Sequence, residues 1–531
     1  MKTKIYRRLL TGVSFVICQI VLSLTLTSCV NDLHVDNINP MQTSELDANA
    51  LLNKIYSSFV LTGQVGPDGD KDIADIDEGR SDLYRKSWEM NEFPTGEASW
   101  QWDDTGLPEL LSKSWGADNA SSVGLYYRLF FSITLCNYYL DTVGDDGSED
   151  IKKKRAEVRF IRSLLYYYIM DLYANAAFIE HVSQEPGIRY TRGEYFSYIE
   201  KELQEIESDL AAPGTNQYGR VDKVAAWMLF ARLYLNAEIY TGTPQWAKAK
   251  EYAEKVINNG YYKLNTKGAT NPKTGETYSA YQMLFLADND THGAQYENIF
   301  PILNDGIKTQ SHGSMHFLVL STYAKRDASD MDVIIPSGTD VSWGKCMAVT
   351  GQLVDAFFGK GVSAPESTLA VTDITSAASD DRALFYTTGF SRDITDRSQE
   401  KQGYGCVKFR NVRSDGKPAS SLAKVDTDLP LMRIAEAYLT YAEAETRLNG
   451  STAAAKEKMD AIRNRAHAVT HNTYDLSEIE EEWIREFWFE GRARIDQIRF
   501  GHYNVPTYRF IYPIPNNDLT NNPNLVQNPG Y

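Results

Sequence analysis

The chain has 531 residues, of which 43% are hydrophobic, and a formal net charge of −17 at pH 7. This composition is typical of a globular protein with an ample core, and the negative charge makes nucleic acid and anionic lipid surfaces poor partners of its body. Its five cysteines are widely spaced, which fits neither a disulfide scaffold nor a zinc site.

The first 28 residues have the pattern of a secretory signal peptide. Four basic residues lie among the first eight, and residues 9–26 are almost free of strongly polar side chains. The run LTSC that ends at Cys29 resembles a bacterial lipobox, which implies cleavage before Cys29 and lipidation of that residue. The alternative is a single transmembrane helix, because the apolar run approaches the ~20 residues that span a bilayer. We predict removal of residues 1–28 and a lipid tether on Cys29.

Helical periodicity dominates the first and last thirds of the remaining chain. We predict helices over residues 43–61, 125–143, 151–173 and 195–210. Two further pairs of segments, 223–240 with 246–258 and 431–448 with 453–466, resemble tetratricopeptide units of ~34 residues. Such units bury their faces only by stacking on neighbours. The predicted fold class is therefore all-α, with tetratricopeptide-like helical pairs forming a superhelical frame.

The stretches 62–120 and 260–430 differ from this frame because they are rich in Gly, Pro, Asp, Ser and Thr. Loops this long usually carry function or are disordered, and their tryptophan content argues against disorder. We therefore expect long ordered excursions on one structural domain that starts after the signal peptide. Its predicted regions are a helical region over 29–260 with a ligand-binding loop at 62–120, a loop-rich insert with further ligand-binding residues over 261–430, and a helical region over 431–531.

The last third of the chain carries its most specific motifs. They read RIAEAY from Arg433, REFWFEGR from Arg485, DQIRFG from Asp496, YPIP from Tyr512 and QNPGY at the end. Together these motifs resemble the SusD/RagB family of surface nutrient-binding lipoproteins of gut-type Bacteroidetes, and the match runs from the lipobox to the last residue. Four other stretches resemble the starch-binding member of that family; they are 63–67, 100–102, 305–309 and 413–418.

The resemblance implies a partner and a function. The partner is a SusC-like, TonB-dependent importer in the outer membrane, which a lipoprotein of this kind caps from the cell surface. The function is non-catalytic capture of oligosaccharides for that importer, with starch and malto-oligosaccharides as the first expectation. Three alternatives are another glycan or a glycopeptide bound in the same mode, a surface glycosidase, and a protein-interaction scaffold of the kind that tetratricopeptide-like pairs form.

Tryptophan residues in the loop regions are the candidate ligand-binding groups. A sugar ring packs its apolar C–H face on an indole, while its hydroxyls need polar partners at the ring edge. Trp102 and Trp343 fall where the resemblance places binding aromatics, so we predict that both are sugar platforms. Trp100 shares a face with Trp102 if the segment is extended, and Arg85 lies a short loop away. For the remaining two loop tryptophans, Trp88 and Trp115, we predict that they only pin the loops to the helices.

A histidine occupies the position where the family's starch-binding member carries a third aromatic. His312 stands there, before Gly313, and an imidazole stacks less broadly than a phenol ring. His316 and Tyr323 are alternatives if chain length has shifted the contact. A metal site at His312 and His316 is disfavoured, because Gly and Ser separate them in a predicted loop, and we predict no metal-binding histidine.

An acidic stretch is a candidate site for binding a metal ion. Five aspartates and a glutamate crowd residues 68–78, but Ile73 and Gly79 occupy the places where an EF-hand needs Gly and Glu. We predict a solvated acidic loop and no cofactor, with a looser calcium site as the alternative.

Glu486 and Glu490 stand one helical turn apart, near the ~5–5.5 Å between the carboxyl groups of a retaining glycosidase. Arg485, Arg492 and Arg494 are at hand to neutralise them, which would lower rather than raise a carboxyl pKa. We therefore predict ion-paired structure at these glutamates, no catalytic residue and no enzymatic activity.

Overall fold

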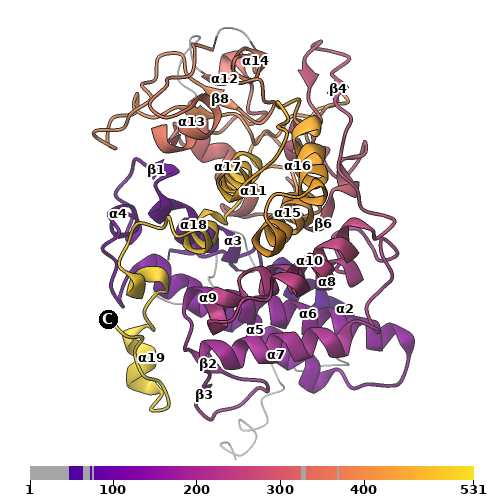
Figure 1. The fold of residues 1–531 in the computed structure, drawn as a ribbon. Coiled ribbons are helices and arrows are strands. Elements are labelled where there is room, and N and C mark those ends of the chain that lie inside the picture. Colours follow the sequence, from indigo (N-terminus) through magenta and orange to yellow (C-terminus); the bar gives the residue numbers. More distant parts are fainter. Residues whose placement is uncertain (1–46, 64–71, 74–76, 325–330, 368–369) are drawn as a thin grey trace, which may run out of the picture. The chain divides into compact units, whose positions relative to one another are not determined.

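The computed structural model describes residues 47–63, 72–73, 77–324, 331–367 and 370–531 (Figure 1). The predicted signal peptide, Cys29 and most of the acidic stretch lie outside these residues. The contacts of Asn49–Tyr531 form one compact unit, while the region boundaries at 260 and 430 stay predictions. No helix of the described ranges is long and apolar enough to cross a membrane.

Helices build most of the amino-terminal half, and α5 and α6 are the longest of them. They are α2 (Ala48–Ser57), α3 (Leu83–Glu92), α4 (Leu107–Leu111), α5 (Ala120–Thr142), α6 (Glu149–Leu172), α7 (Arg192–Ile206), α8 (Lys223–Leu235), α9 (Ala237–Thr241) and α10 (Trp246–Ile257). Asp82, Asn119 and Ser148 cap the first turns of α3, α5 and α6 by accepting a backbone N–H hydrogen bond. Thr191 and Glu194 form a capping box at the start of α7.

Further helices follow in the second half. They are α11 (Ser314–Thr322), α12 (Met331–Ile334), α13 (Gly351–Phe358), α14 (Thr372–Ala378), α15 (Ala435–Asn449), α16 (Ala453–Arg465), α17 (Leu476–Phe487), α18 (Ala493–Phe500) and α19 (Asn516–Asn521). Five 3₁₀ turns occur among the described residues: η2 (Glu78–Arg80), η3 (Phe93–Thr95), η4 (Gln282–Phe285), η5 (Ala294–Tyr296) and η6 (Thr507–Phe510).

The described strands form antiparallel pairs only. The pairs are β1 (Ala98–Trp100) with β7 (Met347–Val349), β2 (Ala177–Phe178) with β3 (Ile188–Arg189), β4 (Ala269–Thr270) with β5 (Thr277–Tyr278), β6 (Asn298–Ile302) with β10 (Leu429–Arg433), and β8 (Phe385–Tyr386) with β9 (Gly405–Cys406). The fold is thus mainly helical with small two-stranded sheets, which confirms the predicted fold class.

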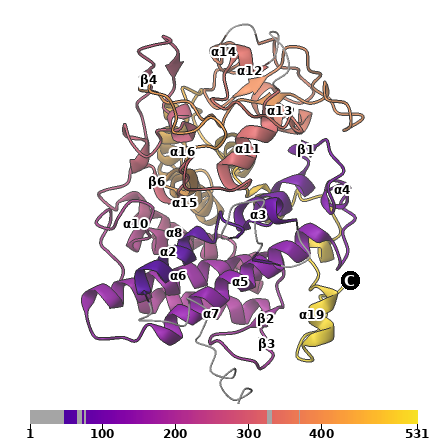
Figure 2. The same ribbon diagram turned by 180° about the vertical axis from the view of Figure 1, so that it is seen from behind.

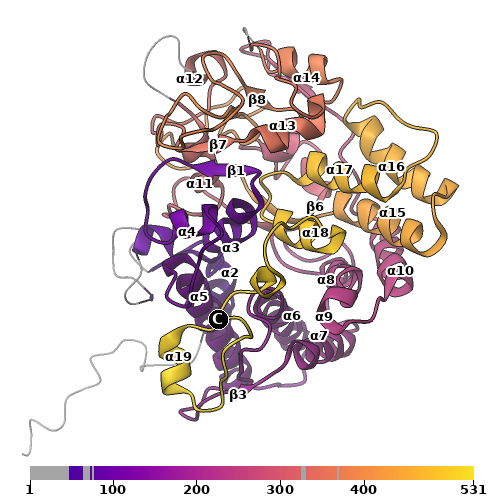
Figure 3. The ribbon, with the colours of Figure 1, turned by 60° about the vertical axis from the view of Figure 1, so that its left-hand side comes forward.

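The two predicted helical pairs are present and stack on each other. Helix α10 packs against both α8 and α15, and α15 packs against α16 (Figure 3). Two predicted boundaries are wrong. The segment 223–240 is divided at Asn236, which ends α8 and hydrogen-bonds through its side chain to Arg499 at 3.0 Å. Residues 431–433 belong to β10 rather than to a helix, because their backbone pairs with β6.

The loop-rich stretches contain more helix than predicted. Trp88 lies in α3, not in a loop, and Figure 2 shows α3 and α11 beside β1. Both Trp88 and Trp115 are buried, and their indole N–H groups donate to Phe489 O at 2.9 Å and to the Tyr531 hydroxyl at 2.8 Å. These bonds join distant parts of the chain, which is the structural role predicted for both tryptophans.

Candidate functional site

The antiparallel pair of β1 and β7 brings two segments together that are far apart in the sequence. Trp100 pairs with Met347, and the Gln101 N–H donates to the carbonyl oxygen of Cys346 at 2.7 Å. Because the strands run in opposite directions, the residues after β1 and the residues before β7 leave the same end of the pair. This pairing places the segments of Trp102 and Trp343 next to each other.

Helix α11 fixes the second of these segments. The backbone N–H of Trp343 donates to the carbonyl oxygen of Leu320 at 2.8 Å, and the Ser342 hydroxyl donates to the carbonyl oxygen of Tyr323 at 2.5 Å. The half-buried Trp343 indole then stands at 83–84° to the imidazole rings of His312 and His316, with centroid distances of 6.1 and 6.0 Å.

Arg85, on α3, lies beneath these rings. Its guanidinium carbon is 4.6 Å from the ring centroid of Phe317, 5.3 Å from that of Trp343 and 5.9 Å from that of Trp100. Arg85 is only 3% exposed, and its Nε donates to the Glu89 carboxylate at 3.2 Å. A cation placed among three aromatic rings is attracted to each of them. Arg85 therefore holds the rings together from below and has little surface of its own.

Trp100 and Trp102 differ in exposure. Trp102 is 43% exposed, whereas Trp100 is fully buried and donates its indole N–H to Asp104 at 2.8 Å. Their ring centroids are 5.6 Å apart at 79°. Strand β1 ends at Trp100, so the two residues do not share an extended face. Trp100 presents no surface to a sugar in this structure and forms the base on which the Trp102 indole stands.

Together these side chains form one aromatic surface. Ring contacts run from Trp102 through Trp100 and Phe317 to Trp343, with centroid distances of 5.6, 5.8 and 6.4 Å. The structure thus gathers every residue of the predicted site: Trp102, Trp343, Trp100, Arg85 and His312. We call the three with exposed surface, Trp102, Trp343 and His312, the aromatic platform. That the platform binds sugar stays a prediction.

The two alternatives to His312 are less accessible. Tyr323 is fully buried, so its ring offers no face to a ligand. His316 is 4% exposed, and its Nδ1 has no hydrogen-bond partner within the described structure. Burial, together with the nearby cations of Lys424 and Arg85, holds the pKa of His316 well below its usual range. His316 is therefore a neutral imidazole beneath the platform.

Gly313 explains how closely α11 approaches α3. A Cβ on this residue would lie 2.0 Å from the carboxylate of Asp82, a distance that no side-chain atom can occupy. Asp82 is itself buried and caps α3 by accepting from the backbone N–H of Arg85 at 2.8 Å. The glycine thereby lets His312 reach the helix that carries Arg85. A glycine is therefore required at position 313 for steric reasons.

Buried carboxylates lie behind β1. Glu97, the residue before the strand, is fully buried and accepts from the side-chain amide of Gln497 at 3.0 Å. Burial raises its pKa to about 7; the hydrogen bond from Gln497 opposes the rise, and the negative charges of Asp496 and Glu480 add to it. The pKa of the neighbouring Glu92 is raised too, by burial and by Glu97.

The raised pKa of Glu97 makes the stability of the fold dependent on pH. The folded chain holds this proton more tightly than the unfolded chain, so the contribution is full below about pH 4.5 and is lost as the pH rises through about 7, a total of about 3 kcal/mol. We expect Glu97→Gln to gain in free energy of unfolding relative to the unmodified protein between pH 5 and pH 8. Denaturant titrations at both pH values measure this difference, and an equal pH dependence in both proteins contradicts the assignment.

Possible metal ligands gather at a site that the sequence did not reveal. Asp288, His292 and Asp415 have ligand atoms within 4.8 Å of one another, contributed by two distant loops. The Asp288 carboxylate already accepts from the backbone N–H and the hydroxyl of Ser414, at 2.9 and 2.8 Å. The carboxylate oxygens of the two aspartates are of the kind that calcium prefers, whereas the imidazole of His292 is not. Of the predicted acidic loop, the described acidic residues are Asp72, Asp77 and Glu78, and Asp72 pairs with Arg128 at 3.1 Å.

The carboxylate pair at Glu486 and Glu490 is ion-paired, as predicted, but with other partners. Arg433 contacts both glutamates, at 2.5 and 2.8 Å. The expected partners point elsewhere, since Arg485 pairs with Glu481, Arg492 with Asp496 and Arg494 with Asp171. Helix α17 ends at Phe487, so Glu490 and Arg492 lie between α17 and α18, and the helical spacing predicted for Glu486 and Glu490 is wrong.

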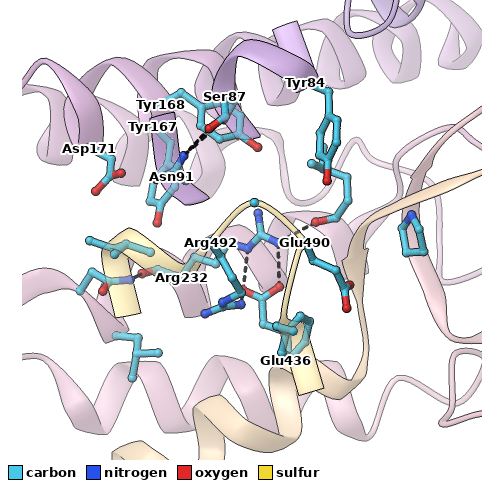
Figure 4. Close-up of a pocket in the computed structure, with 17 residues that line it drawn as sticks. Tyr84, Ser87, Asn91, Tyr167, Tyr168, Asp171, Arg232, Glu436, Glu490 and Arg492 are labelled. Carbon is cyan, nitrogen blue, oxygen red and sulfur yellow. Dashed lines mark hydrogen bonds and ion pairs between the residues drawn. The ribbon is translucent and has the colours of Figure 1, made fainter. Parts of the chain in front are cut away.

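A small pocket lies between α3, α6, α8 and the segment before α18 (Figure 4). Its volume is about 60 Å³, and the Arg232–Glu436 ion pair of 2.6 Å forms part of its wall. The buried hydroxyl of Tyr84 also lines it and has no hydrogen-bond partner within the described structure. A polar space of this size accommodates a few water molecules. It is too small for an oligosaccharide.

The fold defines a mainly helical protein, and the platform is its candidate ligand site. The sequence profile of the SusD family matches residues 379–511. The chain is 37% identical to the starch-binding protein SusD of Bacteroides thetaiotaomicron, over the full length of both. Among solved structures, it is similar to a SusD-like carbohydrate-binding protein of Bacteroides fragilis (TM-score 0.66, 18% identity, 90% of this chain and 98% of that one) and to a laminarin-binding SusD-like protein (0.64, 18%, 92% and 100%).

The chain belongs to the SusD family. The glycan-binding proteins of this family are non-catalytic, which confirms the prediction that the chain is not an enzyme. The ion-paired state of Glu486 agrees with this, since the guanidinium groups of Arg465, Arg433 and Arg382 outweigh the effect of burial and hold its pKa well below its usual range.

Proposed function

We propose that this protein captures oligosaccharides at the bacterial cell surface and passes them to an outer-membrane importer. The observation that carries the proposal is the aromatic platform, in which the exposed indole of Trp102 and the half-exposed indole of Trp343 rest on one buried base. Rigid aromatic faces with polar groups at their edge are what a sugar ring needs. The lipobox at Cys29 supports a lipid anchor in the outer membrane.

Starch and malto-oligosaccharides are the ligands that we propose. The relative that is 37% identical over its full length is named a starch-binding protein. A helical α-glucan is curved, and an arc of aromatic rings matches such a curve over two or three sugar residues. His312 offers a smaller ring than the other two platform residues, so we expect the sugar to contact mainly Trp102 and Trp343.

The expected affinity is weak. At about 0.3 kcal/mol per non-hydrogen atom, two sugar rings contribute at most roughly 7 kcal/mol. That corresponds to a Kd between micromolar and millimolar, weak enough to release the oligosaccharide. Release suits the second part of the proposal, in which the cargo passes to a SusC-like, TonB-dependent transporter.

Calorimetric titration of the purified protein with maltoheptaose tests the proposal. We expect weak exothermic binding, and laminarin oligosaccharides serve as the comparison β-glucan. If only the β-glucan gives heat, the proposed ligand changes from starch to another glycan bound at the same platform. Nanomolar binding of a short sugar, or hydrolysis of either oligosaccharide, would contradict the proposed function.

A further inference from the structure

A loop between β8 and β9, residues 391–402, contacts the segment that carries Trp102. The Nη1 atom of Arg397 lies 3.4, 3.3 and 3.2 Å from the carbonyl oxygens of Trp100, Gln101 and Trp102, and its Nη2 atom pairs with the Asp103 carboxylate. The Gln101 side chain donates in return to a carbonyl oxygen of this loop, that of Ser398, at 2.9 Å. One guanidinium group thus binds three successive carbonyl oxygens and the next carboxylate.

The loop itself is braced, so it presents Arg397 from a fixed base. The Gln402 side-chain oxygen accepts from the backbone N–H groups of Thr395 and Asp396, at 2.6 and 2.8 Å. The Asp396 carboxylate accepts from the Ser398 N–H at 3.0 Å. These bonds close the loop on both sides of Arg397.

The same loop is joined to the segment of the second platform tryptophan. The buried Lys345, two residues after Trp343, donates its ammonium to the carbonyl oxygens of Gln402 and Gly403 at 3.3 and 3.1 Å. One loop therefore contacts the chain beside both indoles. It is in a position to set how Trp102 lies relative to Trp343.

The Trp102 segment needs such support. Its strand ends at Trp100, and Trp102 itself stands in an irregular bend with 43% of its surface exposed. If the backbone at Trp102 is ordered only when the sugar binds, the free energy of ordering reduces the affinity. A backbone that is already ordered in the free protein avoids this cost. We propose that Arg397 is a positioning residue of the glycan site, which fixes the Trp102 backbone so that the indole stays ready for a sugar ring. This inference rests on the proposed function.

Arginine is required for this role. Its planar guanidinium offers several N–H donors in a fixed geometry, whereas lysine offers a single ammonium on a flexible stem. We expect Arg397→Ala to weaken binding of maltoheptaose about tenfold, or about 1.4 kcal/mol, and Arg397→Lys to restore only part of it. Arg392→Ala is the matched control, because Arg392 lies on the same loop but pairs with Asp355 and Asp393.

A readout without ligand separates this inference from the choice of glycan. In protein labelled with 5-fluorotryptophan, the ¹⁹F resonance of Trp102 is identified by its loss in Trp102→Phe. We expect Arg397→Ala to shift or broaden that resonance and Arg392→Ala to leave it unchanged. If the unmodified protein gives no heat with maltoheptaose, the starch proposal fails, and the resonance alone decides the inference. An unchanged resonance in Arg397→Ala overturns it.

A double variant tests whether Arg397 acts through Trp102. In a Trp102→Ala background, we expect Arg397→Ala to change the affinity less than twofold, because the ring that it positions is gone. A full tenfold loss in that background would overturn the positioning role. The melting temperature of each variant shows whether the fold is intact.

Discussion

Replacement of Arg433 by methionine is expected to lower the free energy of unfolding by about 3–5 kcal/mol, the range for breaking a buried ion pair by removing one partner. Arg433 contacts three glutamates: Glu297 at 3.1 Å, Glu486 at 2.5 Å and Glu490 at 2.8 Å. Arg433, Glu297 and Glu486 have no exposed side-chain surface. The substitution leaves part of the negative charge of these buried carboxylates without a cationic partner, and the protein interior solvates charge poorly.

The rest of the network explains why the loss is not larger. Arg465 also contacts Glu297 and Glu486, and Lys408 contacts Glu490 at 2.8 Å. These cations keep part of the negative charge neutralised after Arg433 is removed. The network joins β10, α16 and α17, so its disruption affects the packing of the whole carboxy-terminal region.

Denaturant unfolding followed by circular dichroism measures this effect. The control is Lys201→Met, since Lys201 and Glu205 form a surface pair of 3.8 Å with 72% and 46% of their side chains exposed. Exposed pairs contribute at most about 1 kcal/mol. Equal and small losses in both variants would show that the buried network does not stabilise the fold.

Much of the fold follows from local sequence pattern. Helix α7 was predictable because its buried residues recur every three to four positions. Boundaries fixed by distant partners were not. Residues 431–433 have a helical pattern, yet they form a strand because β6 lies beside them. The partners of Glu486 were wrong for the same reason, since they come from three other parts of the chain.

The candidate site shows the same division. Family motifs placed Trp102 and Trp343 together, which no spacing rule could do, because they meet only through β1 and β7. No local pattern indicates that Trp100 is buried beneath Trp102, or that Phe317 links the two halves of the surface. Arg397 was missed altogether, since it lies in a polar loop with no local motif. Apart from the Asp103 carboxylate, its partners are backbone carbonyl oxygens, which every residue type has and which no sequence motif indicates.

Substitution of Trp343 by alanine is expected to abolish measurable binding of maltoheptaose, with a loss of at least about 30-fold, or about 2 kcal/mol, as for a buried aromatic anchor of an interface. Trp343 contributes a sugar face and also packs over Arg85 at 5.3 Å and His312 at 6.1 Å. The variant therefore loses both the contact and the order of the platform. Trp102→Ala is expected to lose less, since the buried Trp100 remains in place beneath it.

The comparison of aromatic and aliphatic replacements separates contact from folding. Trp343→Phe keeps a ring over Arg85 and is expected to retain weak binding, whereas Trp343→Ala is not. The control is Trp227→Ala, a partly buried tryptophan on α8 whose indole donates to Glu207 at 2.8 Å, outside the platform. Calorimetry measures the affinity of all three variants for maltoheptaose, and their melting temperatures show whether each is folded. Undiminished binding in a folded Trp343→Ala protein would move the glycan site away from the platform, because the variant lacks one of the two indoles that the sugar is expected to contact.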